Sequence, residues 1–243
     1  EMQRSLVGSE RCKCRRFGIL IARPAGGTSC RLAISAKGGT NAENHNHNDV
    51  GSYAVALGSE TMVGDQGGPN SYPGDYFNGD APQKYKIKGS FGHPVPVVDG
   101  RTQSSGGKAK GVVLQKEFTN EKDVFSIDYT SAYSTPNLDK LIRTFVYDRQ
   151  GEGNFTVGDE FTAKTPIRFE TAITTRADWK ILDDTHLLLA TDSEQMIVAI
   201  EASGKVAFTS ETIEVNSPAY TRIGIALKNQ SKEGYIRLKM YTK

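Results

Sequence analysis

Hydrophobic and polar residues alternate with a period of two along most of this chain, and no long stretch keeps a helical period. Near the C-terminus, for example, Ile236, Leu238 and Met240 alternate with Arg237 and Lys239. Successive side chains of a strand point to opposite faces, so such a run offers one face to a core and the other to water. The same pattern recurs in the runs 167–173, 196–200 and 223–227.

Further segments rich in β-branched and aromatic residues also predict strands, namely 17–22, 31–36, 52–57, 111–117 and 141–147. The best helix candidate is 138–146, but the β-branched and aromatic residues at its end favour a strand there too. Gly, Asn and Asp lie between the runs, and no internal repeat is visible. The pattern therefore predicts an all-β protein, a large antiparallel β-sandwich that forms a single domain over 1–243.

The stretch 64–92 breaks this alternation and is rich in Gly, Pro, Asn, Asp and Tyr. Loops of this length in compact domains are usually functional or disordered. Histidines precede and follow it in the sequence. The loop is therefore the first place to look for a functional site.

Composition narrows the class of protein. Thirty Lys and Arg against 28 Asp and Glu give a net charge of +2, which excludes a nucleic-acid binder driven by bulk charge. No apolar run approaches the ~18 residues of a membrane-spanning helix. Cys12, Cys14 and Cys30 cannot all pair, and they lack the spacing of a thiolate zinc site. Because the chain begins with Glu1 and shows no signal peptide, we expect a mature or excised fragment.

Three of the four histidines lie close together in the sequence, at positions 45, 47 and 93. In an extended segment His45 and His47 would point the same way, about 6 to 7 Å apart. Imidazole and carboxylate together suit zinc, and Asp49 and Asp65 supply oxygen donors nearby. An isolated H-x-H pair also recurs by chance, as a surface or core feature. His186, in D-D-T-H-L-L-L, is expected to be such an ordinary histidine.

Three sequence blocks resemble one known family, the C-terminal β-sandwich domain of the heparinase II/III-like polysaccharide lyases, which are related to oligoalginate and alginate lyases. In order, the blocks are K-G-G-T-N-A-E-N-H-N-H-N-D-V-G-S-Y, V-G-D-Q-G-G and S-F-G-H-P-V-P-V-V-D-G-R-T-Q. The later stretch from Asp128 through Tyr133 to Arg143 and Asp148 also resembles the family's strand pattern. The resemblance covers most of the chain and implies a supersandwich-like fold with a long metal-bound loop.

The resemblance implies one zinc ion held by His47, Asp65 and His93. In that family the zinc is mainly structural and ties the long loop to the sandwich. An ion at this place would close a loop that its composition predicts to be too polar to pack by itself. Three protein ligands leave a fourth position for water or another group. The alternative for Asp65 is an ordinary turn aspartate.

The resemblance also implies that His45 is catalytic, beside the metal and in the substrate cleft. Lyases of this kind cleave uronate-containing acidic polysaccharides by β-elimination, which needs a base for the C5 proton and an acid for the leaving O4. Among the loop tyrosines we predict Tyr85 to be catalytic, whereas Tyr72 and Tyr76 would pack the loop. Many relatives have an Arg-rich stretch before this tyrosine, and this chain does not.

Lys84, Lys86 and Lys88 are spaced for one face of a strand. Near a lyase cleft they would bind substrate carboxylates or sulfates as point charges. The alternative is a solvated edge strand guarded by lysines against edge pairing.

The family's other half is an N-terminal α/α toroid, and no helical pattern of that size occurs in these 243 residues. The resemblance therefore implies a β-domain of a larger bacterial, periplasmic enzyme that degrades glycosaminoglycan or alginate, with the toroid as its partner and a homodimer as a further possibility. The isolated chain would be inactive. One alternative is a non-catalytic carbohydrate-binding or oligomerisation module of the same fold. A cupin-like metal enzyme is weaker, because its motif carries a Glu ligand shortly after the H-x-H pair.

Overall fold

The computed structural model describes residues 11–14, 18–24, 26–65, 67–215 and 217–243. Its strands form antiparallel sheets throughout, which confirms the predicted all-β sandwich. Phe17 of the predicted run 17–22 lies outside the described residues.

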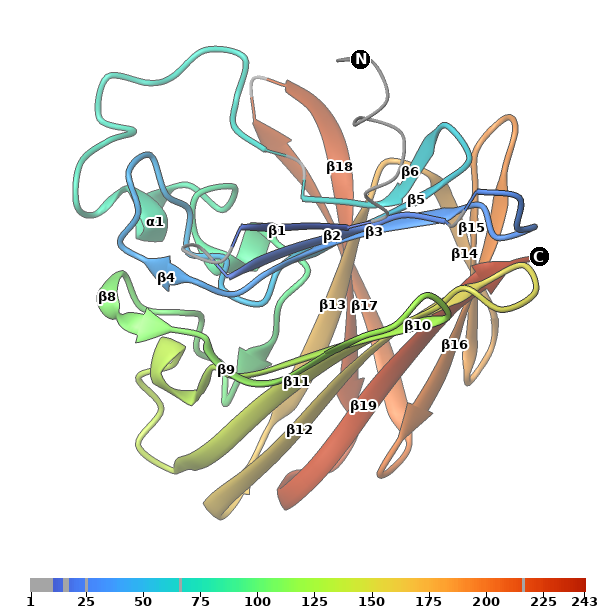
Figure 1. The fold of residues 1–243 in the computed structure, drawn as a ribbon. Helices are drawn as coiled ribbons and strands as arrows, with labels where there is room; N and C mark the ends of the chain where they lie inside the picture. The colour runs from blue at the N-terminus through green and yellow to red at the C-terminus, as the bar shows by residue number, and fades with distance from the viewer. Residues whose placement is uncertain (1–10, 15–17, 25, 66, 216) are drawn as a thin grey trace.

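The two main layers are a five-stranded and an eight-stranded sheet (Figure 1). In spatial order the five-stranded sheet contains β1 (Arg11–Cys14), β2 (Ile19–Ala22), β3 (Leu32–Lys37), β5 (Tyr53–Leu57) and β6 (Glu60–Val63). The eight-stranded sheet contains β14 (Asp178–Asp183), β15 (His186–Ala190), β16 (Gln195–Ala202), β19 (Ser231–Thr242), β12 (Asn154–Ile167), β11 (Leu138–Asp148), β10 (Lys122–Asp128) and β9 (Val112–Phe118).

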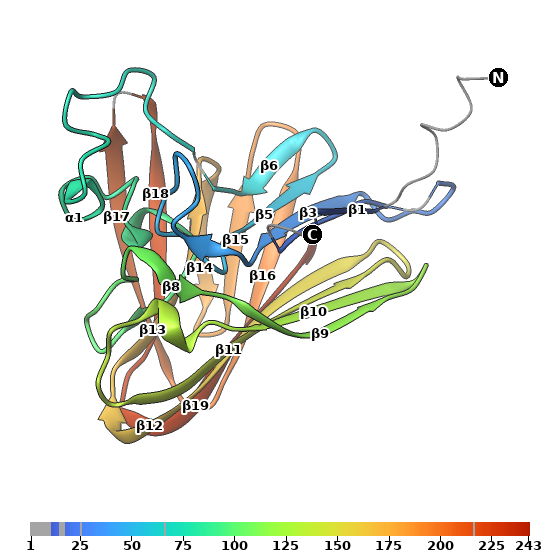
Figure 2. The ribbon, with the colours of Figure 1, turned by 60° about the vertical axis from the view of Figure 1, so that its left-hand side comes forward.

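A four-stranded sheet extends the sandwich (Figure 2), and a two-stranded ribbon includes the strand that precedes the H-x-H segment. The four strands are β17 (Val206–Val215), β18 (Ser217–Leu227), β13 (Phe169–Thr175) and β7 (Val97–Val98). The ribbon pairs β4 (Thr40–Asn41) with β8 (Gly106–Lys110).

Aromatic side chains fill the space between the two main sheets. The ring of Phe145 stacks on Phe125 at 6.0 Å and on Phe155 at 6.2 Å, all within the eight-stranded sheet. Tyr53 of β5 reaches across from the opposite sheet, with its ring 5.9 Å from that of Phe155. Alternation along strands such as β3, β5 and β11 thus delivers one side of each main sheet to a shared core.

Two expectations about the strands have different outcomes. The alternative helix over 138–146 is absent, because this stretch forms β11 with alternate residues buried. The prediction of a single strand over 167–173 is wrong. Ile167 ends β12 in the eight-stranded sheet, and Phe169 begins β13 in the four-stranded sheet. Exposed Arg168 lies between them, so one alternating run supplies two sheets while its apolar side stays buried.

The long loop has its own small apolar cluster, which corrects the expectation that it is too polar to pack. Tyr76 and Ile87 of the loop are buried against Ile213 of β17 and Tyr220 of β18. Within the loop lie the short helix α1 (Ala81–Lys84) and a 3-10 turn, Ser90–Gly92. Figure 2 shows this segment beside β17 and β18.

Helical structure in the described residues is limited to α1 and two 3-10 turns, Ser90–Gly92 and Thr130–Ala132. No α/α toroid lies within this part of the chain. None of its helices has the length and apolar content needed to cross a membrane.

Truncating the aromatic stack should test the core. Phe145, only 1% exposed, contacts aromatic rings from both sheets, so Phe145→Ala is expected to lower the free energy of unfolding by about 3–5 kcal/mol. Leu114→Ala on β9 is the control, because Leu114 is 51% exposed and its truncation should cost under about 0.5 kcal/mol. Urea unfolding measures both, and equal losses would contradict this description of the core.

Candidate metal centre

The H-x-H segment lies between β4 and β5 and follows an irregular path of turns. The backbone of His45 has a φ of 58°, in the left-handed region, so the regular pleat is broken there. The exposed ring of His45 consequently packs edge-on against Phe77, at 5.5 Å. The ring of His47 instead lies 5.2 Å from that of His93. The two histidines therefore diverge, and only the second faces the predicted metal site.

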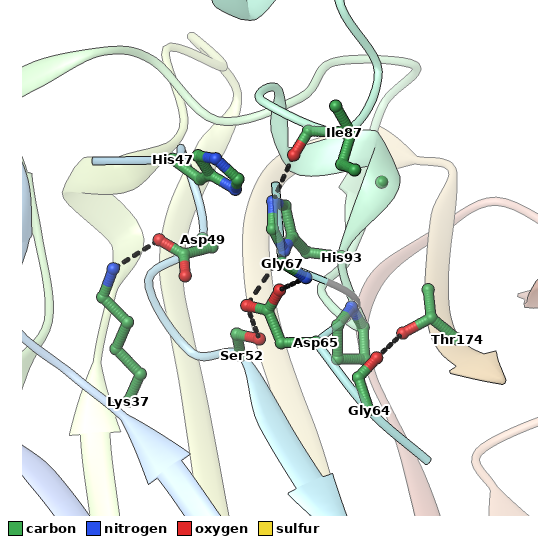
Figure 3. Close-up of polar contacts among 12 residues, drawn as sticks. Lys37, His47, Asp49, Ser52, Gly64, Asp65, Gly67, Ile87, His93 and Thr174 are labelled. Carbon is green, nitrogen blue, oxygen red and sulfur yellow. Dashed lines mark hydrogen bonds and ion pairs between the residues drawn. The ribbon is translucent and has the colours of Figure 1, made fainter. Parts of the chain in front are cut away.

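His47, Asp65 and His93 converge (Figure 3). One potential ligand atom from each lies within 4.8 Å of the others, and no other such group occurs in the described part of the chain. His93 Nδ1 is 3.1 Å from Asp65 Oδ2. Residues separated by 18 and 28 positions thus form one cluster that could hold a metal ion, as the family resemblance implied.

Packing around the Ser90–Gly92 turn fixes the orientation of His93. Its ring is 1% exposed, and Nε2 donates a hydrogen bond to the Ile87 carbonyl at 3.0 Å. Nδ1 is buried and makes no well-formed hydrogen bond, although it faces Asp65. A backbone carbonyl on one imidazole nitrogen and a carboxylate near the other is the arrangement that orients a metal-binding histidine. The residues present therefore fit a cation.

The strand that precedes Asp65 aims its carboxylate at the histidines. Asp65 follows β6, and the Thr174 hydroxyl of β13 donates to the Gly64 carbonyl beside it. Ser52 Oγ donates to Asp65 Oδ2 at 3.1 Å, and the Gly67 N–H donates to Oδ1 at 3.2 Å. Asp65 is therefore more than a turn aspartate, because its carboxylate is oriented from the sandwich.

The charges of the cluster leave two of its three residues, His47 and Asp65, in the form that binds a metal. Burial, followed by the nearby charge of His93, lowers the pKa of His47 to about 4. Burial opposes ionisation of Asp65 and His93, but their mutual attraction outweighs it. The pKa of Asp65 therefore falls below its ordinary value, and the pKa of His93 rises above it. At neutral pH His47 is uncharged and Asp65 ionised, which are the protonation states that bind metals, whereas His93 would release a proton when an ion binds.

Asp49, the other carboxylate near the H-x-H pair, has a different partner. Asp49 is buried and forms an ion pair with Lys37, whose Nζ lies 2.5 Å from its Oδ1. It is outside the group of converging ligand atoms. Asp49 therefore ties the H-x-H segment to Lys37 of β3 and does not belong to the ligand cluster.

Gln103 is a structural contributor that the sequence did not single out. Its side-chain amide donates to the Val50 carbonyl at 2.7 Å and accepts from the Val50 N–H at 3.1 Å. Its backbone N–H donates to Ser90 Oγ at 2.8 Å. The residue joins the H-x-H segment to the turn that carries His93. Its only sequence signal was its place at the end of a block used for the resemblance.

The structure also separates the three loop tyrosines. Tyr76 is 2% exposed, and its hydroxyl is 3.1 Å from His47 Nε2. Burial raises the pKa of Tyr76 to about 12. Tyr85 donates its hydroxyl hydrogen to Asp75 at 2.5 Å, and its ring is 5.4 Å from that of Tyr76. Tyr72 is exposed and contacts the Tyr76 ring. The tyrosine in contact with the cluster is thus Tyr76, whereas Tyr85, the predicted catalytic tyrosine, contacts Asp75.

The prediction that Lys84, Lys86 and Lys88 lie on one face of a strand is wrong, because residues 84–88 form the end of α1 and a turn. Lys84 pairs with Asp75, and Lys86 pairs with Glu211 of β17. Lys88 is only 8% exposed and donates to the Tyr76 carbonyl, with its ammonium 4.8 Å from that ring's centre. The three side chains have different partners and do not share one face.

His186 lies outside the cluster, at the start of β15. It is part-exposed and pairs with Asp183 at 3.0 Å. It is therefore a suitable control for substitutions of the cluster histidines.

Comparison with known proteins supports the fold. No family model matches the sequence. No curated protein matches it either. Among solved structures, heparinase III shares a TM-score of 0.74 at 16% identity, over 96% of this chain and 36% of its own. This chain has a heparinase-like fold.

Two further structures agree. Heparan sulfate lyase HepC from Pedobacter heparinus gives a TM-score of 0.75 at 13% identity, over 97% of this chain and 37% of its own. A structure described as the heparinase III BT4657 gene product gives a TM-score of 0.72 at 12% identity, over 96% of this chain and 36% of its own. The fold expected from the sequence resemblance is confirmed. This chain spans little more than a third of the length of these structures.

The cluster depends on close backbone packing at Gly92, which offers a test. A Cβ there would lie 2.3 Å from the Lys86 carbonyl oxygen and 2.8 Å from Ile87 Cα. Gly92→Ala should therefore cost about 1–3 kcal/mol and raise hydrogen exchange over 85–93. Gly79→Ala in the same loop is the control, because nothing lies within 4 Å of its Cβ position. Equal protection in the two variants would contradict this account of how His93 is held.

Proposed function

We propose that this chain is the zinc-bearing β-domain of a polysaccharide lyase that cleaves acidic, uronate-containing polysaccharide by β-elimination. The observation that carries the proposal is the convergence of His47, Asp65 and His93, with the accessible ring of His45 on the same segment. The heparinase-like fold supports the reaction class, since two of the similar structures are described as a heparinase and a heparan sulfate lyase.

Zinc is the proposed ion because two imidazoles and a carboxylate form a ligand set typical of that metal. His47, Asp65 and His93 would hold it, and they come from three separate segments of the chain. Bound zinc would supply a cross-link between these segments and a fixed positive charge near His45. Its role is therefore mainly structural.

His45 is the proposed acid–base residue, because its ring is exposed and free of the ligand cluster. In β-elimination the C5–H bond breaks, a C4–C5 double bond forms, and the C4–O4 bond breaks as O4 takes a proton. A neutral imidazole can take the C5 proton, and a protonated group can supply the proton to O4.

Tyr85 is the proposed second acid–base residue. Its hydroxyl is hydrogen-bonded to Asp75, and its ring belongs to the aromatic group that also contains Phe77, the neighbour of His45. Lys84 and Lys86 remain accessible, with side chains 54% and 56% exposed, and are proposed to bind substrate anions as point charges. Lys88 would take part only by supporting Tyr76, because it is buried against that residue.

The chain is proposed to act with an α/α toroid of the same protein, which would complete the substrate groove. The similar solved structures are nearly three times as long as the part that this chain covers, which leaves room for such a domain. We place the whole enzyme in the bacterial periplasm. The isolated chain should be inactive because half of the groove would be missing.

Metal content tests the proposed site. The wild-type chain should retain about one zinc ion per molecule, and His93→Ala should retain almost none, because only two ligands would remain. His186→Ala is the matched control and should bind zinc like the wild type, since that histidine lies on the surface. Atomic emission on protein purified without added zinc measures all three.

Chelation provides the second part of this test. Removing the ion should raise hydrogen exchange in 64–92 before the sandwich strands, whose core does not involve the cluster. Negligible zinc in the wild type, or equal zinc in wild type and His93→Ala, would refute the metal centre.

Activity tests the role of His45. In the enzyme with its toroid, His45→Ala should lower kcat about 10²–10⁴-fold while zinc content stays unchanged. Tyr85→Phe should act in the same direction. Ultraviolet absorbance of the unsaturated uronate product measures turnover on alginate and on heparan sulfate. Full activity of His45→Ala with bound zinc would instead favour a non-catalytic carbohydrate-binding module.

A further inference from the structure

A completely buried arginine lies beneath the metal-ligand cluster. Arg143 of β11 is 0% exposed, yet all five of its N–H groups are hydrogen-bonded. Nε and Nη2 bind the two carboxylate oxygens of Asp159 on β12, each at 2.7 Å, and Nη2 also binds Thr171 Oγ1 at 3.1 Å. The Tyr129 hydroxyl donates to the same carboxylate at 2.6 Å. The charge is thus fully paired inside the sandwich.

The remaining nitrogen joins the two segments that carry the histidine ligands. Nη1 donates to the Gly51 carbonyl and to the Pro94 carbonyl, each at 2.7 Å. Gly51 comes four residues after His47, and Pro94 directly follows His93. Next to Gly51, Ser52 donates to Asp65. One guanidinium nitrogen therefore binds the segments that carry His47 and His93, and the first of these segments also holds Asp65 through Ser52.

Gly51 permits this close approach. Its φ is 88°, a left-handed value that L side chains rarely adopt. A Cβ there would lie 3.3 Å from the Tyr129 ring and 3.6 Å from Arg143 Cδ. The backbone of the H-x-H segment can therefore lie directly against the arginine.

The energetics argue against core stability as the sole role of this ion pair. Burying two charges costs several kcal/mol per ion, and a well-packed apolar pair often stabilises a core equally well. An apolar pair cannot donate hydrogen bonds to two loop carbonyls. Lysine cannot replace the arginine either, because its ammonium lacks the planar fork that binds Asp159 through two nitrogens while a third donates elsewhere.

We propose that Arg143 is a positioning residue of the metal centre: it sets the separation of the His47 and His93 segments through the Gly51 and Pro94 carbonyls. This inference rests on the proposed zinc site. None of the hydrogen-bond partners of Arg143 is a side chain of a proposed metal ligand, so Arg143 acts through the backbone. The eight-stranded sheet thereby determines the geometry of a cluster built on loops.

Arg143→Lys is the direct test, read by competition for zinc between the purified chain and a chelator of known affinity. The variant should bind zinc about 10-fold or more weakly, the usual effect of losing a group that orients metal ligands. Its Co²⁺-loaded form should show altered visible bands, because these report the arrangement of the ligands around the ion.

Arg149→Lys is the matched control. Arg149 is 3% exposed, pairs with Asp123 and donates to the carbonyls of Arg23 and Thr119, outside the ligand-bearing segments. Its replacement should lower the melting temperature of the zinc-free chain but leave zinc affinity and the Co²⁺ spectrum unchanged. Melting of both zinc-free variants separates lost stability from lost positioning.

Thr171→Val tests the same idea if Arg143→Lys does not fold. It keeps the ion pair and the side-chain volume but removes the hydroxyl that joins Arg143 to Asp159, so a smaller weakening of zinc binding is expected. Wild-type affinity in the folded Arg143 variant, or in Thr171→Val if only that variant folds, would overturn this inference alone. A wild-type chain without zinc would overturn the metal centre and this inference together.

Discussion

The buried ion pair between Arg143 and Asp159 is the interaction on which the arrangement of the site depends. It joins neighbouring strands of the eight-stranded sheet, reaches Thr171 of the four-stranded sheet, and extends to the carbonyls of two loops. Such a charge is tolerated in a core only when every polar atom around it is satisfied. The loops are thus fixed to the sandwich by the same bonds that satisfy the arginine.

Around this pair the loops form a site with two distinct parts. The broken pleat at His45 sends one histidine to the surface and the next one inward, toward Asp65 and His93. An exposed imidazole and a member of the ligand cluster then occupy positions two residues apart. A regular strand would have aimed both rings to the same side.

The long loop shows how a polar segment gains order without a regular strand. Tyr76 and Ile87 bury apolar surface against Ile213 and Tyr220, while Lys88 supports the Tyr76 carbonyl and ring. An ion at the cluster would therefore add a cross-link to a loop that already has a packed base. The composition alone predicted a loop too polar to pack. Its many Gly, Pro and Asp residues outnumber the few apolar and aromatic side chains that form the packed base.

Alternation along the sequence predicted the fold class and many of the strands, and the family resemblance supplied the three candidate metal ligands. Period-two alternation is a local property that needs no tertiary contact, and short motifs such as H-N-H-N-D are legible in the same local way. Arg143 also carried a readable signal, since it shares the inward-facing positions of β11 with Leu141 and Phe145. Only the tertiary structure decided that Tyr76 rather than Tyr85 contacts His47, and that the lysines diverge. These choices depend on contacts between residues far apart in the chain, which sheet pairing and loop packing bring together.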